Sequence, residues 1–319
     1  MAIKKIGIIT RDCAGINATI RAVVRSAVHC GVGVLGIKRG FSGLIENDVQ
    51  PLDRCSVSGI VNHGGTILKT ARATEFKRKQ GQIKALRTIQ KNALDGLIVI
   101  GGNGSLAGAH TLADKYSVPV IGIPATIDND INQVPMTIGA DTAVNVALEA
   151  LDKIRDTATS LERIFLVEVM GRACGYIALR VALAGGCEEV IVPEKQFDIK
   201  KICKEITKGY GQGKITWIIV VAEGKARAAD LSKIISKITK LETREVVLGH
   251  IQRGGAPTAF DRILAARYGQ FAVNALLNKK TDKCVTLKND NLALIPLKTA
   301  IEKKDIEVSS YYKLIKLLT

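Results

Sequence analysis

GLIVIGGNGS, Gly96 to Ser105, and VPVIGIPATIDND, Val118 to Asp130, decide how this chain folds. Each stretch begins with a short apolar run of the kind that forms a strand buried on both faces of a parallel sheet. A helical pattern from Leu106 to Lys115 lies between them. Because ligands of open α/β sheets bind beyond the carboxyl ends of the strands, the two loops that follow these strands are the first candidates for a site.

The first of these loops, Gly101 to Gly104, has the composition of a phosphate-binding loop. Glycine lets the backbone turn sharply and approach a ligand, and the N–H groups at the start of the following helix attract an anion. A strand-to-helix turn that needs glycine only for its geometry explains the same pattern. Taken alone, the loop leaves both interpretations open.

The second loop places Thr126, Asp128, Asn129 and Asp130 directly after a buried strand. Carboxylates beside a polyphosphate orient a metal ion or accept the proton of an attacking hydroxyl, and a kinase needs both functions. The alternative is an Asx-rich turn. Together the two loops favour phosphoryl transfer.

Length and composition are those of a globular enzyme. At 319 residues the chain predicts two domains, and 47% hydrophobic residues supply a sizeable core. The formal net charge of +16 suggests nucleic acid, but aromatic residues make up only 4% of the chain, too few for base stacking. Lysine-rich stretches at 77–91 and 200–208 have the pattern of solvated helix faces. Anionic small molecules are therefore the expected partners, and nucleic acid is not.

Seven scattered cysteines without a CxxC pair predict neither a disulfide framework nor a zinc site. No stretch approaches the ~18 consecutive apolar residues of a membrane-spanning helix. We expect a cytoplasmic protein without a membrane partner.

Short apolar runs alternate with helical patterns along the chain, at 6–9, 32–37, 97–100, 118–123, 164–169, 190–192 and 218–221. This alternation predicts an α/β fold of two similar three-layer α/β/α domains, with mainly parallel sheets that face a shared cleft. The expected domains are residues 1–138 plus 251–303, for nucleotide, and 139–250 plus 304–319, for sugar phosphate. The C-terminal helical pattern, 309–318, is expected to dock on the second.

Two common nucleotide signatures are excluded. GVGVLG, Gly31 to Gly36, matches GxGxxG but precedes a strand, whereas the dinucleotide fingerprint follows one and opens a helix. The chain contains no GxxxxGK[ST]. The phosphate site is therefore of another type.

Polar and basic residues also gather near the predicted strand ends of the second half. Arginine holds phosphate with a bidentate fork, and glutamate accepts hydrogen bonds from sugar hydroxyls. The alternatives are surface salt bridges for each arginine and a core position for the histidine. The residues are Met170, Gly171, Arg172, Glu223, Arg244, His250 and Arg253.

HGGTILKTAR, GGNGS, PATIDND, EVMGR, AEG, LGHIQRGG and PTAFDRILAAR together resemble the bacterial type of ATP-dependent 6-phosphofructokinase over nearly the whole chain. The resemblance implies transfer of the γ-phosphoryl group of ATP to the 1-hydroxyl of fructose 6-phosphate, giving fructose 1,6-bisphosphate and ADP in glycolysis. It also implies Mg²⁺ as cofactor, a homotetramer, and ADP or phosphoenolpyruvate as allosteric effectors.

The resemblance also assigns residues. Asp128 is the implied base, Thr126 and Asp130 lie beside it, and Arg172 stabilises the transition state. The implied substrate-binding residues are Thr126, Asp128, Arg163 from a neighbouring subunit, Met170, Gly171, Arg172, Glu223, Arg244, His250 and Arg253. The implied nucleotide-binding residues are Arg72, Ala73, Gly102, Asn103, Gly104, Ser105 and Gly108. The implied effector site comprises Arg21, Arg25, Arg54, Arg155, Gly186, Glu188, Gln212 and Lys214.

The sequence departs from this family pattern at three catalytic positions. Arg11 alone replaces the Ser-Gly-Gly of the first phosphate loop, which shortens it. Asn103 replaces the usual metal-binding aspartate and brings an oxygen without a charge, and Ala125 replaces a glycine. A catalytically weakened or silent sugar-phosphate or effector-binding subunit is therefore the alternative to an active kinase.

Overall fold

The computed structural model describes residues 3–319, which form two compact units. The first unit comprises Met1–Thr142 and Arg253–Lys304, and the second comprises Ala143–Gln252 and Asp305–Thr319. The division of ligands between the units and the cleft expected between them stay predictions. No helix in the described part of the chain is long and apolar enough to cross a membrane.

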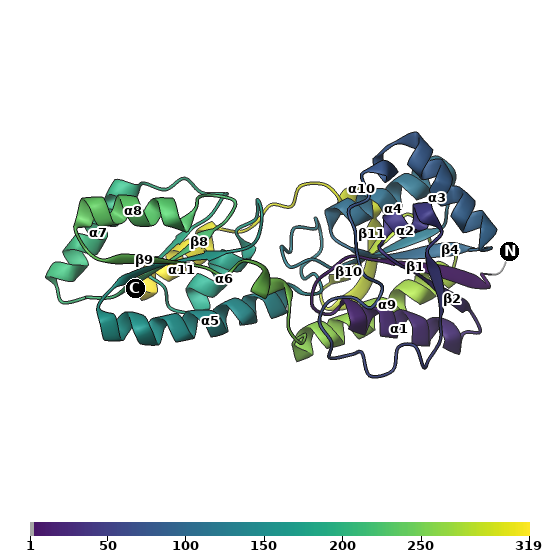
Figure 1. The fold of residues 1–319 in the computed structure, drawn as a ribbon, viewed down its shortest axis with the longest axis horizontal. Coiled ribbons are helices and arrows are strands. Elements are labelled where there is room, and N and C mark those ends of the chain that lie inside the picture. The colour runs from purple at the N-terminus through teal and green to yellow at the C-terminus, as the bar shows by residue number, and fades with distance from the viewer. Residues whose placement is uncertain (1–2) are drawn as a thin grey trace. The chain divides into compact units, whose positions relative to one another are not determined.

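The first unit is built on a seven-stranded sheet in the order β11-β10-β5-β4-β1-β2-β3 (Figure 1). Its inner strands pair in parallel, whereas β3 and β11 are antiparallel edge strands. The strands are β1 (Lys5–Thr10), β2 (Gly33–Ile37), β3 (Val49–Leu52), β4 (Gly96–Gly101), β5 (Val120–Pro124), β10 (Lys283–Lys288) and β11 (Asn291–Pro296).

Helices cover both faces of this sheet, as the alternating pattern predicts. Successive side chains of a strand point to opposite faces, so Leu97 and Val99 of β4 pack into a core with the apolar side of one helix layer. That layer consists of α2 (Phe41–Glu46), α3 (Lys79–Lys91), α4 (Asn103–Tyr116) and α10 (Leu297–Ala300), with the short η1 (Glu75–Lys77). The other layer consists of α1 (Ile16–His29) and α9 (Ala259–Leu277), which pack against each other.

A change of direction in the strand order fixes where the first unit can bind a ligand. From β1 the chain moves outward to β2, and from β4 it moves the opposite way to β5, although β1 and β4 are neighbours. Ligands of open α/β sheets bind at the carboxyl ends of such strands. The loops after β1, β4 and β5 are tied there by Arg11 N to Ile100 O and by Ala125 N to Gly101 O, each at 3.1 Å.

The second unit carries a four-stranded, wholly parallel sheet in the order β7-β8-β6-β9. Its strands are β6 (Ile164–Val169), β7 (Glu189–Ile191), β8 (Trp217–Ala222) and β9 (Thr243–Val247). One face packs against α7 (Ile199–Gly211) and α8 (Ala228–Thr239), which share an apolar core with it. The remaining elements are α5 (Ala140–Leu161), which begins in the first unit, α6 (Tyr176–Ala184), η2 (Gly249–Arg253) and α11 (Ser309–Leu318).

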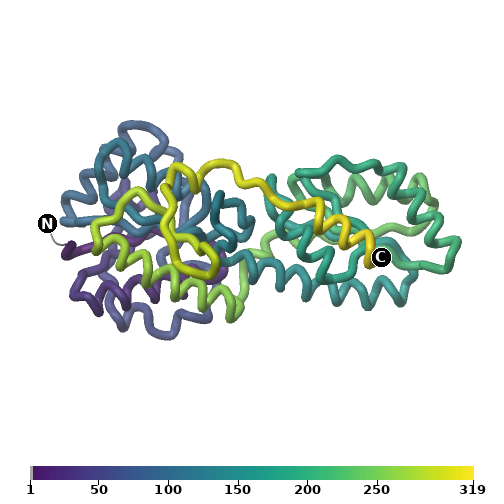
Figure 2. The backbone as a smooth tube through the Cα atoms, turned by 180° about the vertical axis from the view of Figure 1, so that it is seen from behind, coloured from purple at the N-terminus to yellow at the C-terminus, as the bar shows by residue number. Residues whose placement is uncertain are grey.

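The C-terminal helix α11 belongs to the second unit and packs beside α6 (Figure 2). Lys316 reaches the sheet, where its ammonium lies 2.8 Å from the buried carboxylate of Glu189 and 2.9 Å from that of Glu205. The hydroxyl of Tyr312 donates to the same Glu189 carboxylate at 3.2 Å. The alternation of apolar and basic residues predicts this docking, and the ion pairs of Lys316 are the contacts that hold the helix.

Candidate active site

The glycines after β4 are required by close approach to neighbouring loops. A Cβ atom at Gly101 would lie 2.7 Å from Oγ of Ser105 and 2.9 Å from Cγ of Arg11. At Gly102 it would lie 3.2 Å from Cβ of Thr126. At Gly104 it would meet nothing within 4 Å. The loop is thus packed on its protein side and open at Gly104, where the first N–H groups of α4 begin.

Helix α4 begins at Asn103, three residues before the sequence pattern predicts. Asn103 therefore belongs to the first turn rather than to the loop. Two further predicted nucleotide residues also lie on this helix: Ser105 is buried, and Gly108 has the ring of Phe41 against it, 2.7 Å from where a Cβ would lie. Packing against Phe41 is therefore by itself a reason for glycine at position 108.

Asn103 and Asp130 present two oxygens that suit a hard metal ion. The amide nitrogen of Asn103 donates to the backbone oxygen of Asp130 at 3.2 Å, which orients the amide. Oδ1 of Asn103 and Oδ1 of Asp130 are buried, and neither has a hydrogen-bond partner within the described residues. Buried polar atoms are normally satisfied, and Mg²⁺ prefers oxygen ligands. These two residues fit a magnesium ion.

Asp128 lies in a loop that its neighbours hold rigidly. Its side chain is nearly buried, at 2% exposure, and its N–H points to Oγ1 of Thr126 at 3.3 Å. Asn129, with φ of 48°, donates from its amide to Pro135 O at 3.0 Å and accepts from Thr137 N at 2.9 Å. Asn129 therefore has a structural role in this loop. The sequence pattern did not distinguish it from the other polar residues there.

Lys304 is a support of this loop that sequence reasoning missed. Its ammonium donates to the backbone oxygen of Asn129 at 2.8 Å and to that of Val134 at 2.7 Å. Lys304 lies 175 and 170 residues from these two acceptors in the chain, which leaves no local sequence signal for the contacts.

Arg11 connects the end of β1 with a predicted nucleotide-binding segment. Its guanidinium donates from Nη1 to Ala71 O at 2.8 Å, next to Arg72 and Ala73, and its Cγ packs over Gly101. Arg72 is exposed and Ala73 half-buried. The arginine that shortens the first loop therefore ties that loop to its neighbours.

Asp261, in the PTAFDR segment, is a second missed residue. Its carboxylate is fully buried and accepts from Gly139 N and Thr142 N, each at 2.9 Å, and from the Thr142 hydroxyl at 2.5 Å. Burial raises the pKa of this carboxyl, although the same hydrogen bonds oppose the shift. Asp261 thereby fixes the start of α5. Among the described residues, no other carboxylate side chain is as deeply buried.

In the second unit, four predicted residues meet at the carboxyl ends of β6 and β8. Oε1 of Glu223 accepts from Gly171 N at 3.3 Å and from Arg172 N at 3.0 Å. Gly171 has φ of 142°, and a Cβ there would lie 2.4 Å from Cys174 O. Arg172 is exposed with a left-handed φ of 52°. Such strained backbone is common at binding sites, and here Glu223 stabilises it.

Gln252 supports Met170, the fourth of these residues. It is fully buried and accepts from Met170 N at 2.8 Å. The neighbouring His250 is exposed, so it is not a core histidine. The motif LGHIQRGG contains Gln252, but the sequence pattern did not reveal a role for it.

Arg253 belongs to the first unit, which also contains Asp128. Burial raises the pKa of the Cys13 thiol, the negative charges of Asp261, Asp12 and Asp128 raise it further, and the charge of Arg253 opposes them.

Arg163 and Arg244 lie at the other end of the second sheet. Arg163 precedes β6, and Arg244 faces Phe165 in the β6–β9 register, whereas Met170 follows β6. Five strand residues at roughly 3.3 Å each separate the two ends by about 16 Å. Arg244 lies at the start of β9, whereas His250 follows that strand. One copy of this unit does not bring all its predicted residues together.

Four predicted effector residues do meet in the second unit. Arg155 donates to the carbonyls of Gly185 and Gly186, the latter at 3.0 Å. Lys214 lies 3.1 Å from Oε1 of Glu188, whose Oε2 accepts from the backbone. Gln212 is exposed at the end of α7. The remaining three predicted residues, Arg21, Arg25 and Arg54, lie in the first unit.

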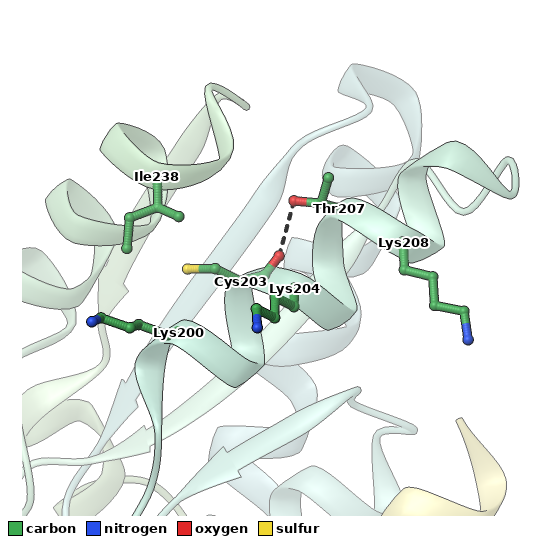
Figure 3. A pocket seen from close by; sticks show the side chains of 6 residues that line it. All are labelled: Lys200, Cys203, Lys204, Thr207, Lys208 and Ile238. Carbon is green, nitrogen blue, oxygen red and sulfur yellow. Dashed lines mark hydrogen bonds between the residues drawn. The ribbon is translucent and has the colours of Figure 1, made fainter.

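A pocket of about 630 Å³ between α7 and α8 contains none of the predicted residues (Figure 3). Its lining consists of Lys200, Cys203, Lys204, Thr207, Lys208 and Ile238. The figure shows the ammonium of Lys208 pointing away from Ile238, so the lysines do not converge. Their exposure agrees with the solvated helix face that the sequence predicts.

The arrangement agrees with what is found in known proteins. A family model described as phosphofructokinase matches residues 5–276. "ATP-dependent 6-phosphofructokinase" of Thermoanaerobacter sp. (strain X514) is 48% identical over 319 residues, which cover 99% of both chains. The enzyme of that name from Thermotoga neapolitana is 45% identical over 318 residues, covering 99% of this chain and 100% of its own.

Solved structures agree in fold. Phosphofructokinase of Pichia pastoris in the T-state superposes with a TM-score of 0.88 at 33% identity, over 94% of this chain and 38% of that longer chain. A pyrophosphate-dependent phosphofructokinase of Marinobacter aquaeolei shares the fold at 20% identity, with a TM-score of 0.84 over 99% of this chain and 91% of its own. The two three-layer α/β units, the glycine and carboxylate loops and these likenesses together show that the chain belongs to the phosphofructokinase family.

Proposed function

We propose that this chain transfers the γ-phosphoryl group of ATP to the 1-hydroxyl of fructose 6-phosphate, giving fructose 1,6-bisphosphate and ADP. One observation carries the proposal: Asp128 is held rigidly beside a glycine loop that opens α4, so a base lies next to a phosphate site. The family likeness over the whole chain supports the same reaction.

Asp128 acts as the general base. Its carboxylate accepts the proton of the 1-hydroxyl while the hydroxyl oxygen attacks the γ-phosphorus and the bond to the β-phosphate oxygen breaks. Burial keeps water away from this carboxylate. Thr126, at the start of the loop, orients it through the Asp128 N–H.

The guanidinium of Arg172 stabilises the charge that develops on the transferring group. Glu223 holds its backbone, and Met170 and Gly171 line the sugar beside it. His250 and Arg253 complete the sugar-phosphate contacts.

Asn103 and Asp130 would hold Mg²⁺, since both offer a buried oxygen without a hydrogen-bond partner among the described residues. The ion would supply positive charge that offsets the negative charge of the donor phosphates. The nucleotide itself lies along Gly102, Gly104 and Ser105. Arg72 and Ala73 line it from the segment whose Ala71 carbonyl accepts from the Arg11 guanidinium.

Arg163 and Arg244 bind the 6-phosphate in a second copy of the chain. The length of β6 separates them from Met170 and Arg172, so a single copy lacks part of its own site. The active form is therefore an oligomer, which we propose to be a homotetramer, acting in the cytoplasm. Arg155, Gly186, Glu188 and Lys214, with Gln212 and the arginines at 21, 25 and 54, bind ADP or phosphoenolpyruvate as effector.

A coupled assay with purified protein, ATP, Mg²⁺ and fructose 6-phosphate tests the proposal by ADP release. The alternative, a catalytically silent subunit, predicts sugar-phosphate binding in calorimetry without turnover. Its motivation is Asn103, an uncharged side chain at a magnesium site. Asn103→Asp adds that charge and is expected to raise kcat several-fold and to tighten Mg²⁺ binding, whereas Asn278→Asp, an exposed change of the same kind, leaves both unchanged.

A further inference from the structure

Glu242 joins the two arginines at the amino end of the second sheet. Its Oε2 lies 2.8 Å from Nε of Arg163, and its Oε1 lies 2.5 Å from Nη2 of Arg244. One carboxylate therefore serves two guanidinium groups at once. Nothing in the sequence pattern singled out this residue.

The backbone fixes the three residues relative to one another. Ile164 N donates to Glu242 O at 3.1 Å, directly after Arg163. Arg244 is the second residue of β9 and faces Phe165 in the β6–β9 ladder. Because sheet hydrogen bonds set these positions, the two guanidinium groups are assembled before a ligand arrives.

A stronger anion can replace Glu242 in its contacts with Arg163 and Arg244. The side chains of Arg163, Glu242 and Arg244 are 26%, 46% and 57% exposed, so water reaches the Glu242–Arg244 pair. Nε of Arg163 is itself buried, but its contact with Glu242 is an ion pair without hydrogen-bond geometry. Solvent-exposed pairs contribute little, whereas a phosphate dianion with two arginines forms several charge-assisted hydrogen bonds.

We propose that Glu242 is a positioning residue, which holds Arg163 and Arg244 together in the absence of substrate and which the 6-phosphate of the sugar displaces. The inference rests on the proposed function of the two arginines. In this role the Glu242 carboxylate competes with a phosphate monoester dianion for the two arginines, so Glu242 lowers the affinity for substrate. The chemical step, carried out by Asp128, is unaffected.

Glu242→Gln tests this role because it keeps the size of the side chain and removes the charge. The half-saturating concentration of fructose 6-phosphate is expected to fall about fivefold, with kcat and the KM for ATP unchanged. The difference shrinks at 0.5 M salt, since the contacts are exposed. Glu245→Gln is the matched control, an exposed glutamate on β9 three residues further along the chain, and leaves the half-saturating concentration as it is.

A half-saturating concentration that is unchanged or raised in Glu242→Gln overturns the inference, whatever happens to thermal stability. Failure of the proposed function looks different, because then the wild-type protein releases no ADP at all. In that case the affinity for inorganic phosphate, measured by calorimetry in wild type and Glu242→Gln, still tests the competition. Tighter phosphate binding in the variant supports it, and equal or weaker binding refutes it.

Discussion

The two units hold their functional residues by different means. In the first unit, Asp128 lies in a loop fixed by hydrogen bonds of Asn129 and Lys304 that are buried or partly buried. In the second, the half-buried Arg163 and the exposed Arg244 contact one exposed carboxylate. The difference teaches that the proposed base is fixed, whereas the two arginines proposed to bind the 6-phosphate exchange one anion for another.

Asp128→Asn is the sharpest test of the proposed base in the first unit. The amide cannot accept the hydroxyl proton, so kcat is expected to fall about 1,000-fold, while the KM for fructose 6-phosphate changes only a few-fold. Steady-state assays measure both. Asp114→Asn, an exposed change on α4, is the control and retains full activity. A fall of less than tenfold in Asp128→Asn contradicts the assignment of the base.

Asp261→Ala tests whether buried hydrogen bonds stabilise the first unit. The change leaves Gly139 N and Thr142 N buried without their acceptor, which is expected to cost about 3 kcal/mol of unfolding free energy. Urea unfolding measures the loss. Asp230→Ala, at an exposed position on α8, should lose almost nothing. Equal losses in the two variants would remove Asp261 from the support of the site.

Lys316→Met probes the second unit at the ion pair between Lys316 and Glu189. The variant keeps the aliphatic stem but leaves Glu189, whose side chain is 4% exposed, without its ammonium partner. We expect a loss of about 2 kcal/mol, smaller than for Asp261 because Tyr312 still donates to that carboxylate. Lys313→Met, exposed on the same helix, is the comparison in urea unfolding.

The smallest expected effect is a pH dependence. Burial raises the pKa of Asp261 in the folded state, so the folded protein binds that proton more tightly than the unfolded chain. The resulting stabilisation is complete below the unfolded pKa and is lost as pH rises through the folded pKa. Relative to Asp261→Asn, wild type should therefore gain stability as pH falls from 7 toward 4. A gain in the opposite direction would show that the hydrogen bonds outweigh burial.

Most inner strands of the two sheets could be predicted because buried parallel strands are continuous apolar runs, as in Gly96–Gly101 and Trp217–Ala222. The inner strand β10 was missed, since lysines stand at both ends of Lys283–Lys288. The edge strands β3 and β11 were also missed, since Val49–Leu52 is short and contains proline, and Asn291–Pro296 is half-buried. Edge positions tolerate such sequences.

The places of Asp128 and Arg172 in the fold could be predicted because their motifs follow strands, whereas their roles stay predictions. Contacts that join distant segments could not be predicted, as for Lys304 with Asn129 and Asp261 with Thr142. For Arg244, the motif indicates a place near a strand end but not that this end lies opposite Met170 and Arg172.

The direction of β6 has a genetic consequence. Under the proposed function, Asp128→Asn and Arg244→Ser each inactivate the protein, but they damage sites that different copies complete for each other. Mixing the two inactive proteins under conditions that let subunits exchange should restore part of the activity, since some mixed assemblies contain one intact set. Complementation between two dead alleles would thus follow from a strand of six residues.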